Sequence, residues 1–196
     1  MSNKYTESFG LNVHPTVFGS SVLIIISITI YTLLNLSETA QMFDAIQSVI
    51  ASKAGWFYIL TVNIILGFSI YLIFSKYGKI CIGGKDEKPE FTYFSWFSML
   101  FSAGMGIGLV FYAVAEPISH YLVPPYGDGN SIESAKVAMQ FTFFHWGLHA
   151  WGIYAVLALA LAFFSFNRGL PLTIRSIFYP ILGEKIHGYI GNVIDI

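Results

Sequence analysis

The run Val22-Leu-Ile-Ile-Ile-Ser-Ile-Thr-Ile-Tyr31 contains no charged side chain and decides the fold class of this sequence. It lies inside a longer window, residues 16–37, that has no Asp, Glu, Lys or Arg. Similar windows follow at residues 54–75, 91–115 and 137–167. Each can cross the roughly 30 Å hydrocarbon core of a bilayer as a helix, which takes about 20 apolar residues. The sequence therefore predicts an all-α polytopic membrane protein with four transmembrane helices.

The composition agrees with a membrane location. Hydrophobic residues make up 55% of the chain and charged residues 11%, whereas a soluble domain carries about 25% charged residues. The polar start and the lack of a small-residue cleavage site after the first window argue against a cleavable signal. We expect the lipid bilayer as a partner and no nucleic acid, with a homo-oligomer left open.

The basic residues of the connecting segments predict the orientation. With a cytoplasmic N-terminus, only Lys53 and Lys136 lie outside, while eight lie inside: Lys4, Lys76, Lys79, Lys85, Lys88, Arg168, Arg175 and Lys185. Cytoplasmic loops carry such an excess of basic residues. The expected order is a cytoplasmic N-terminus (1–15), two leading helices (16–75), a cytoplasmic loop (76–90), two further helices (91–167) and a cytoplasmic connection (168–196).

The third window contains the glycine-rich stretch Ser102-Ala-Gly-Met-Gly-Ile-Gly108. Gly104, Gly106 and Gly108 do not share a helical face, because a two-residue step turns a helix by about 200°. Each glycine weakens the helix by roughly 1 kcal/mol relative to alanine. The helix can therefore unwind here and offer main-chain groups to a ligand or ion, as broken helices in transporters do. Tight helix packing through Gly104 and Gly108 is an equal alternative.

Two further features allow more than one interpretation. Glu116, followed by Pro117, ends the third window, and it either contacts a ligand or forms part of a hydrogen-bonded kink. His145 and His149 have the i, i+4 spacing of metal or haem ligands. No Cys, Asp or Glu in their window completes a ligand set, so packing histidines are the favoured reading. A haem- or metal-binding membrane subunit is the alternative function.

The fourth window carries Phe144-His-Trp-Gly-Leu-His-Ala-Trp-Gly-Ile-Tyr154. On one continuous helix, Trp151 would lie about 140° and Tyr154 about 80° from Trp146, so that the three rings share one broad side. Aromatic faces bind quaternary ammonium ions, which have no N–H group for hydrogen bonding. Packing against other helices is the ordinary role of such rings in a membrane.

Four segments together resemble the betaine/carnitine/choline transporter (BCCT) family. They are Ala103-Gly-Met-Gly-Ile-Gly-Leu109, Ala115-Glu-Pro117 with His120-Tyr121, Phe144–Tyr154, and Gly169-Leu-Pro-Leu-Thr-Ile-Arg-Ser176. The resemblance runs from about Pro89 to Ile196 and weakly through the first two windows. It implies a secondary transporter in which two leading helices precede a five-plus-five inverted repeat. The chain would correspond to the leading pair and the first two helices of repeat one, and we expect it to be inactive alone.

The resemblance also implies site residues. Gly104, Met105, Gly106 and Gly108 would line the substrate site, and Ala103, Met105 and Gly108 would take part in coupling to an ion. The rings of Trp146, Trp151 and Tyr154 would form part of an aromatic box around a trimethylammonium group.

The implied function is transport without enzyme activity, cofactor or bound metal. Gly108 resembles the sodium-coupled betaine members, since proton-coupled choline members carry an acidic residue at the matching position. We therefore expect Na⁺-coupled symport of an osmolyte across the plasma membrane. Glycine betaine is the favoured substrate, before choline or carnitine.

Overall fold

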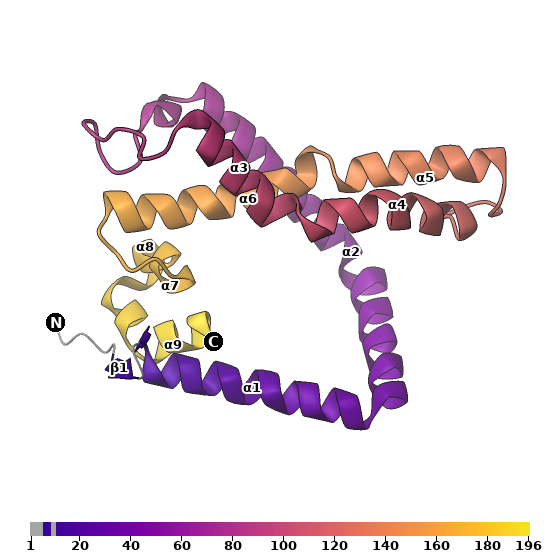
Figure 1. Cartoon of the computed structure of the whole chain (residues 1–196), viewed down its shortest axis with the longest axis horizontal. Coiled ribbons are helices and arrows are strands. Elements are labelled where there is room, and N and C mark those ends of the chain that lie inside the picture. The colour runs from indigo at the N-terminus through magenta and orange to yellow at the C-terminus, as the bar shows by residue number, and fades with distance from the viewer. Residues whose placement is uncertain (1–5, 9–10) are drawn as a thin grey trace. The chain divides into compact units, whose positions relative to one another are not determined.

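The structure is a computed structural model that describes residues 6–8 and 11–196 (Figure 1). It is almost entirely helical, which confirms the all-α fold class. Its described strands, β1 (Thr6–Ser8) and β2 (Leu11–Val13), pair as one short antiparallel hairpin. Residues 1–5 and 9–10 of the expected cytoplasmic N-terminus lie outside the described residues.

The chain divides into two compact units. One contains the residues up to Leu60 together with Ala158–Ile196, and the other contains Thr61–Leu157. The helix α1 (Pro15–Leu34) has 20 residues and starts with a proline, which suits the first helical turn. At about 1.5 Å per residue its length is about 30 Å, enough to cross a bilayer core.

The second helix, α2 (Leu36–Phe74), is longer than expected, with 39 residues. It begins one residue after Asn35, the C-cap of α1. An outer connection was expected between the first two charge-free windows, but in the structure these residues are part of α2. Glu38 and Lys53 are compatible with a helix, because charge limits how far a helix lies in hydrocarbon and not where it ends.

A charged, glycine-containing loop follows, as expected for residues 76–90. It opens with the 3₁₀ helix η1 (Lys76–Lys79), which Ser75 caps. Gly83 and Gly84 have φ angles of 86° and 124°, a region that favours glycine. The chain then enters α3 (Tyr93–Met105), where the hydroxyl of Thr92 accepts a hydrogen bond from the amide of Ser95.

The third window forms two helices, α3 and α4 (Ile107–Leu122), which meet at Gly106. Gly106 has φ −55° and ψ −87°, so the α-helical path is interrupted there. Within the described residues, three segments are long and apolar enough to cross a membrane: Pro15–Leu34, Leu36–Phe74 and Ile132–Asn167. The crossing expected from the third window is thus a broken helix, because glycines weaken the helix in its middle.

The fourth window lies in the long helical segment Ile132–Asn167, and this segment is interrupted by a turn. It forms α5 (Ile132–His145), α6 (Leu148–Ala162) and the π-helix η2 (Phe163–Asn167). Between α5 and α6 the chain turns at Trp146 and Gly147. A Cβ at Gly147 would lie only 2.8 Å from the carbonyl oxygen of Phe143, so this turn requires glycine.

Two helix pairs position the residues of interest within Thr61–Leu157. Helix α4 packs antiparallel along α5 (Figure 1). Helix α6 crosses α2 at Gly152, where an added Cβ would lie 3.5 Å from Cα of Leu66. Most large apolar side chains on the long helices are exposed, as suits a chain whose solvent is lipid.

The expected connection, residues 168–196, is a set of short helices. These are α7 (Ile174–Ile177), α8 (Tyr179–Leu182), η3 (Gly183–His187) and α9 (Tyr189–Asp195). The side chains of Arg175 and Asp195 form an ion pair and are only 7% and 10% exposed. The guanidinium of Arg175 also donates to the carbonyl oxygen of Ile186, 3.3 Å away. One arginine therefore joins α7, η3 and α9.

Candidate functional site

One face of α4 carries Gly108, Tyr112 and Glu116, and Trp146 lies against it. The four-residue spacing places these three residues in a row along the helix. A Cβ added at Gly108 would lie 3.9 Å from Cη2 of Trp146. The ring of Tyr112 lies 6.3 Å from that of Trp146, centroid to centroid. The indole thus runs along two turns of α4.

Glu116 contacts the other end of the indole. Its Oε2 accepts a hydrogen bond of 2.7 Å from Nε1 of Trp146, and its Oε1 lies 2.8 Å from Nδ1 of His145. Nε2 of His120 is 3.6 Å from the same Oε1. The Glu116 side chain is 9% exposed. A buried carboxylate is costly unless its oxygens have partners, and each oxygen of Glu116 has one.

Trp151 and Tyr154 lie beyond the turn, on α6. The Nε1 of Trp151 donates a 2.9 Å hydrogen bond to the carbonyl oxygen of Trp146. The rings of Trp151 and Tyr154 are 6.2 Å apart, centroid to centroid. The three predicted aromatic residues are therefore linked in one chain of contacts. They come from two helical segments, however, so the angles expected on one continuous helix do not apply.

The glycine-rich stretch is described in part. Gly106 is the point where α3 and α4 meet, and Gly108 faces Trp146. The backbone of Ala103, Gly104 and Met105 is helical, but the surroundings of these residues lie outside what the structure describes. Their expected roles in substrate binding and ion coupling stay predictions.

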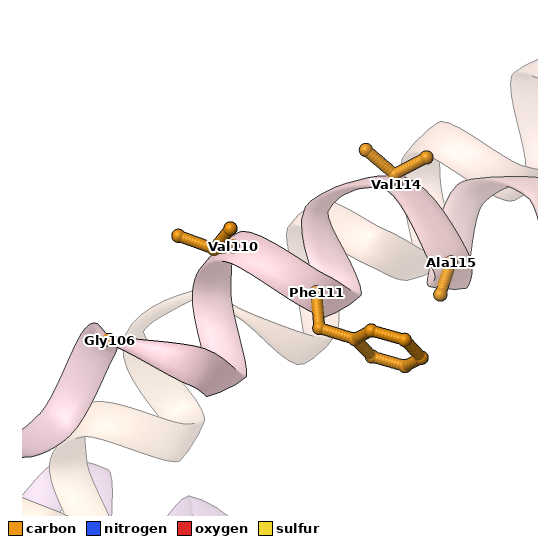
Figure 2. A pocket seen from close by; sticks show the side chains of 5 residues that line it. All are labelled: Gly106, Val110, Phe111, Val114 and Ala115. Atoms are coloured by element: carbon orange, nitrogen blue, oxygen red, sulfur yellow. The ribbon is translucent and has the colours of Figure 1, made fainter.

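The opposite side of α4 carries a shallow apolar pocket of about 550 Å³ (Figure 2). Its lining residues are Gly106, Val110, Phe111, Val114 and Ala115. In Figure 2 the side chains of these residues lie along α4, with Val110 and Val114 on one side of the ribbon and Phe111 and Ala115 on the other. None of the three predicted aromatic residues lines this pocket. It therefore fits helix or lipid packing better than the binding of a charged solute.

The histidine pair does not form the geometry expected of a metal or haem site. His145 ends α5 and His149 lies in α6, so the turn at Trp146 and Gly147 separates them. His145 contacts Glu116, and the ring of His149 packs 4.9 Å from that of Phe144. The alternative function based on these histidines is not supported.

The partner of Glu116 was not predicted from the sequence. Contact with a ligand and a hydrogen-bonded kink were both left open, and the structure shows a hydrogen bond from Trp146, 30 residues further along the chain. The available signal was a carboxylate at the edge of a charge-free window, since such a group needs a partner in a membrane. The sequence could not name that partner.

Long apolar helices with interruptions at Gly106 and at Trp146–Gly147 define a multi-pass membrane protein. The model of the betaine/carnitine/choline family transporters matches residues 16–196. The chain belongs to this family, whose members are transporters and not enzymes.

Two curated relatives illustrate the similarity. The chain is 53% identical over 165 residues to the glycine betaine transporter OpuD of Bacillus subtilis, covering 84% of this chain and 31% of the relative. It is 46% identical over 188 residues to the osmo-independent choline transporter BetT1 of Acinetobacter baylyi, covering 94% of this chain and 35% of the relative. The chain thus spans about a third of the length of these relatives.

Proposed function

We propose that this chain contributes the aromatic part of a site for a quaternary-ammonium osmolyte in a Na⁺-coupled symporter. Glycine betaine is the proposed substrate, followed by choline or carnitine. The observation that supports this proposal is the contact of Trp151 with both Trp146 and Tyr154. Aromatic faces of this kind bind quaternary ammonium ions. The relatives named above, a betaine transporter and a choline transporter, support this substrate class.

Na⁺ coupling is proposed from the glycine-rich stretch. An interrupted membrane helix exposes carbonyl groups, and such groups coordinate sodium in transporters built from broken helices. Gly108 keeps this stretch free of a titratable side chain. Ala103 and Met105 are the other proposed ion-coupling residues, and Gly104, Met105, Gly106 and Gly108 the proposed substrate contacts.

The test uses a hybrid transporter, in which this chain replaces the matching segment of the Bacillus subtilis relative. Expressed in cells without other betaine carriers, it should take up labelled betaine only when Na⁺ is present. Uptake should persist when an ionophore collapses the proton gradient while the Na⁺ gradient is held. Undiminished uptake in Na⁺-free medium would overturn the coupling. Competition by unlabelled choline and carnitine gives the substrate order.

The 196-residue chain by itself should insert but not transport. Alternating access requires one bundle to move against another around the site. The ring of Tyr154 is 63% exposed in this chain, so the aromatic group by itself does not enclose a ligand. Saturable, Na⁺-dependent betaine uptake by cells that express only these residues would contradict this expectation.

We also propose a plasma-membrane protein with a cytoplasmic N-terminus and a cytoplasmic 76–90 loop. The single cysteine, Cys81, lies exposed in that loop. A membrane-impermeant maleimide should label it in opened membranes and not in intact cells. The matched control carries Cys81→Ser with Asp128→Cys in the opposite connection, which should be labelled in intact cells. Labelling of Cys81 from outside would reverse the orientation.

A further inference from the structure

Glu116 accepts a hydrogen bond from Trp146 and lies in the same row of α4 as Gly108, which the indole also faces. We propose that Glu116 is a positioning residue, which holds the Trp146 indole at the orientation in which it meets the quaternary ammonium group, without itself touching the substrate. This inference rests on the proposed function and assigns a role to a residue outside the predicted aromatic group.

The indole of Trp146 faces three residues of α4. Its Nε1, on the five-membered ring, donates to Oε2 of Glu116 at 2.7 Å. Its Cη2, at the far side of the six-membered ring, lies over Gly108. Between these points the ring of Tyr112 packs at a tilt of 41°. The hydrogen bond from Nε1 to Glu116 and the packed ring of Tyr112 therefore set the direction of the indole plane.

The geometry separates Glu116 from direct substrate contact. A carboxylate attracts a quaternary ammonium ion by charge, so direct binding is the natural alternative. Both carboxylate oxygens are engaged, Oε1 by His145 and Oε2 by Trp146, and the side chain is 9% exposed. An incoming cation would have to displace Trp146, the side chain that is to bind it. Glu116 therefore acts through the indole.

A second alternative is that Glu116 only joins α4 to α5 and stabilises the fold. Two substitutions separate these roles. Glu116→Gln removes the charge but keeps an oxygen that accepts from the indole N–H, whereas Glu116→Ala removes the acceptor. If positioning is the role, the glutamine variant should behave like the unsubstituted protein. Glu133→Ala is the control, because Glu133 is 78% exposed and pairs with Lys136 on the same helix.

The first arm of the experiment needs no substrate. The 196-residue chain is placed in lipid nanodiscs with ¹⁵N-labelled tryptophan, and its four indole N–H signals are assigned by single Trp→Phe substitutions. The Trp146 proton should move upfield in Glu116→Ala and stay in place in Glu116→Gln and Glu133→Ala. An unmoved Trp146 signal in Glu116→Ala would overturn the inference. Circular dichroism identifies any variant that has lost its helices. If Glu116→Ala is such a variant, the position of the Trp146 signal in Glu116→Gln decides instead.

The second arm measures betaine binding by the hybrid transporter. Glu116→Ala should weaken binding about tenfold, the scale of part of one desolvated cation–π contact. In a Trp146→Phe background, which has no indole N–H, the same substitution should have little further effect. Fully additive losses would overturn this inference alone. No binding by the unsubstituted hybrid would overturn the proposed function, and with it any role of Glu116 in binding.

Discussion

The indole nitrogen of Trp151 donates a hydrogen bond to the carbonyl oxygen of Trp146, 2.9 Å away, across the turn between α5 and α6. The last carbonyl groups of a helix have no N–H donor within the helix, and the indole of Trp151 supplies a donor at the end of α5. The same side chain places its ring beside that of Tyr154. Trp151 therefore connects the interruption of the helix to the aromatic group of the candidate site.

Trp151→Ala in the hybrid transporter should weaken betaine binding by roughly 1–2 kcal/mol, the scale of one desolvated cation–π contact. Trp151→Phe keeps a ring and should lose less. The matched control is Trp56→Ala, because Trp56 lies on α2 and is 67% exposed. Tryptophan-fluorescence titrations measure both. Equal losses at positions 56 and 151 would contradict the assignment of the aromatic site.

Gly108→Asp should disturb ion coupling or substrate choice. It places a titratable carboxylate in the glycine-rich stretch, and any atom beyond Cβ enters the space beside Trp146. Gly108→Ala is the control, since a Cβ alone would lie at an ordinary contact distance of 3.9 Å. The measurement is the Na⁺ dependence of betaine and choline uptake. Unchanged coupling and selectivity in the aspartate variant would show that Gly108 lies outside the coupling region.

Gly152→Leu should weaken the crossing of α6 over α2 by about 1–3 kcal/mol, the usual cost of overpacking. A Cβ at Gly152 already lies 3.5 Å from Leu66, whereas a Cβ at Gly67 has nothing within 4 Å. Gly67→Leu is therefore the matched control and should not destabilise the chain. Unfolding in mixed micelles, followed by circular dichroism, compares the two. Similar losses of stability in the two variants would mean that helix propensity, and not the close crossing at Gly152, determines the effect.

Arg175→Ala should loosen the short helices of residues 168–196. Removing one partner of a buried ion pair costs about 3–5 kcal/mol, because the other charge stays buried without compensation. Lys136→Ala is the control: the exposed Glu133–Lys136 pair should contribute less than about 1 kcal/mol. Limited proteolysis provides the readout, with faster cleavage after residue 168 expected only for the arginine variant. Equal cleavage rates would contradict the bridging role of Arg175.

Charge-free windows predicted the membrane helices because hydrocarbon tolerates few ionised groups. They predicted α1 closely, since Pro15 and Asn35 bound the apolar run. They missed the start of α2. Charged residues mark where a helix leaves the hydrocarbon, but the helix itself can continue beyond that point. The alternating glycines allowed either a break or tight helix packing, and the structure has a break at Gly106, where helix propensity is weak.

The break at Trp146 and Gly147 was not predicted, because one glycine is ordinarily tolerated within a helix. In the folded turn a Cβ at position 147 would meet the carbonyl oxygen of Phe143, and only the folded backbone reveals that glycine is required there. The aromatic residues of the candidate site were chosen because ring faces suit quaternary ammonium ions, and their role in binding stays a prediction. The partner of Glu116 could not be predicted from the sequence. Trp146 is 30 residues away, and several other groups could donate a hydrogen bond to a carboxylate.

The single-residue corner between α1 and α2 has a practical consequence for epitope tagging. The amide and side chain of Asn35 both donate to the carbonyl of Tyr31, and its own carbonyl accepts from Thr39. Asn35 thus satisfies the ends of two helices at once, and an inserted peptide would leave those main-chain groups without partners. The loop around Gly83 and Gly84, already outside the regular helices, is the better place for a tag.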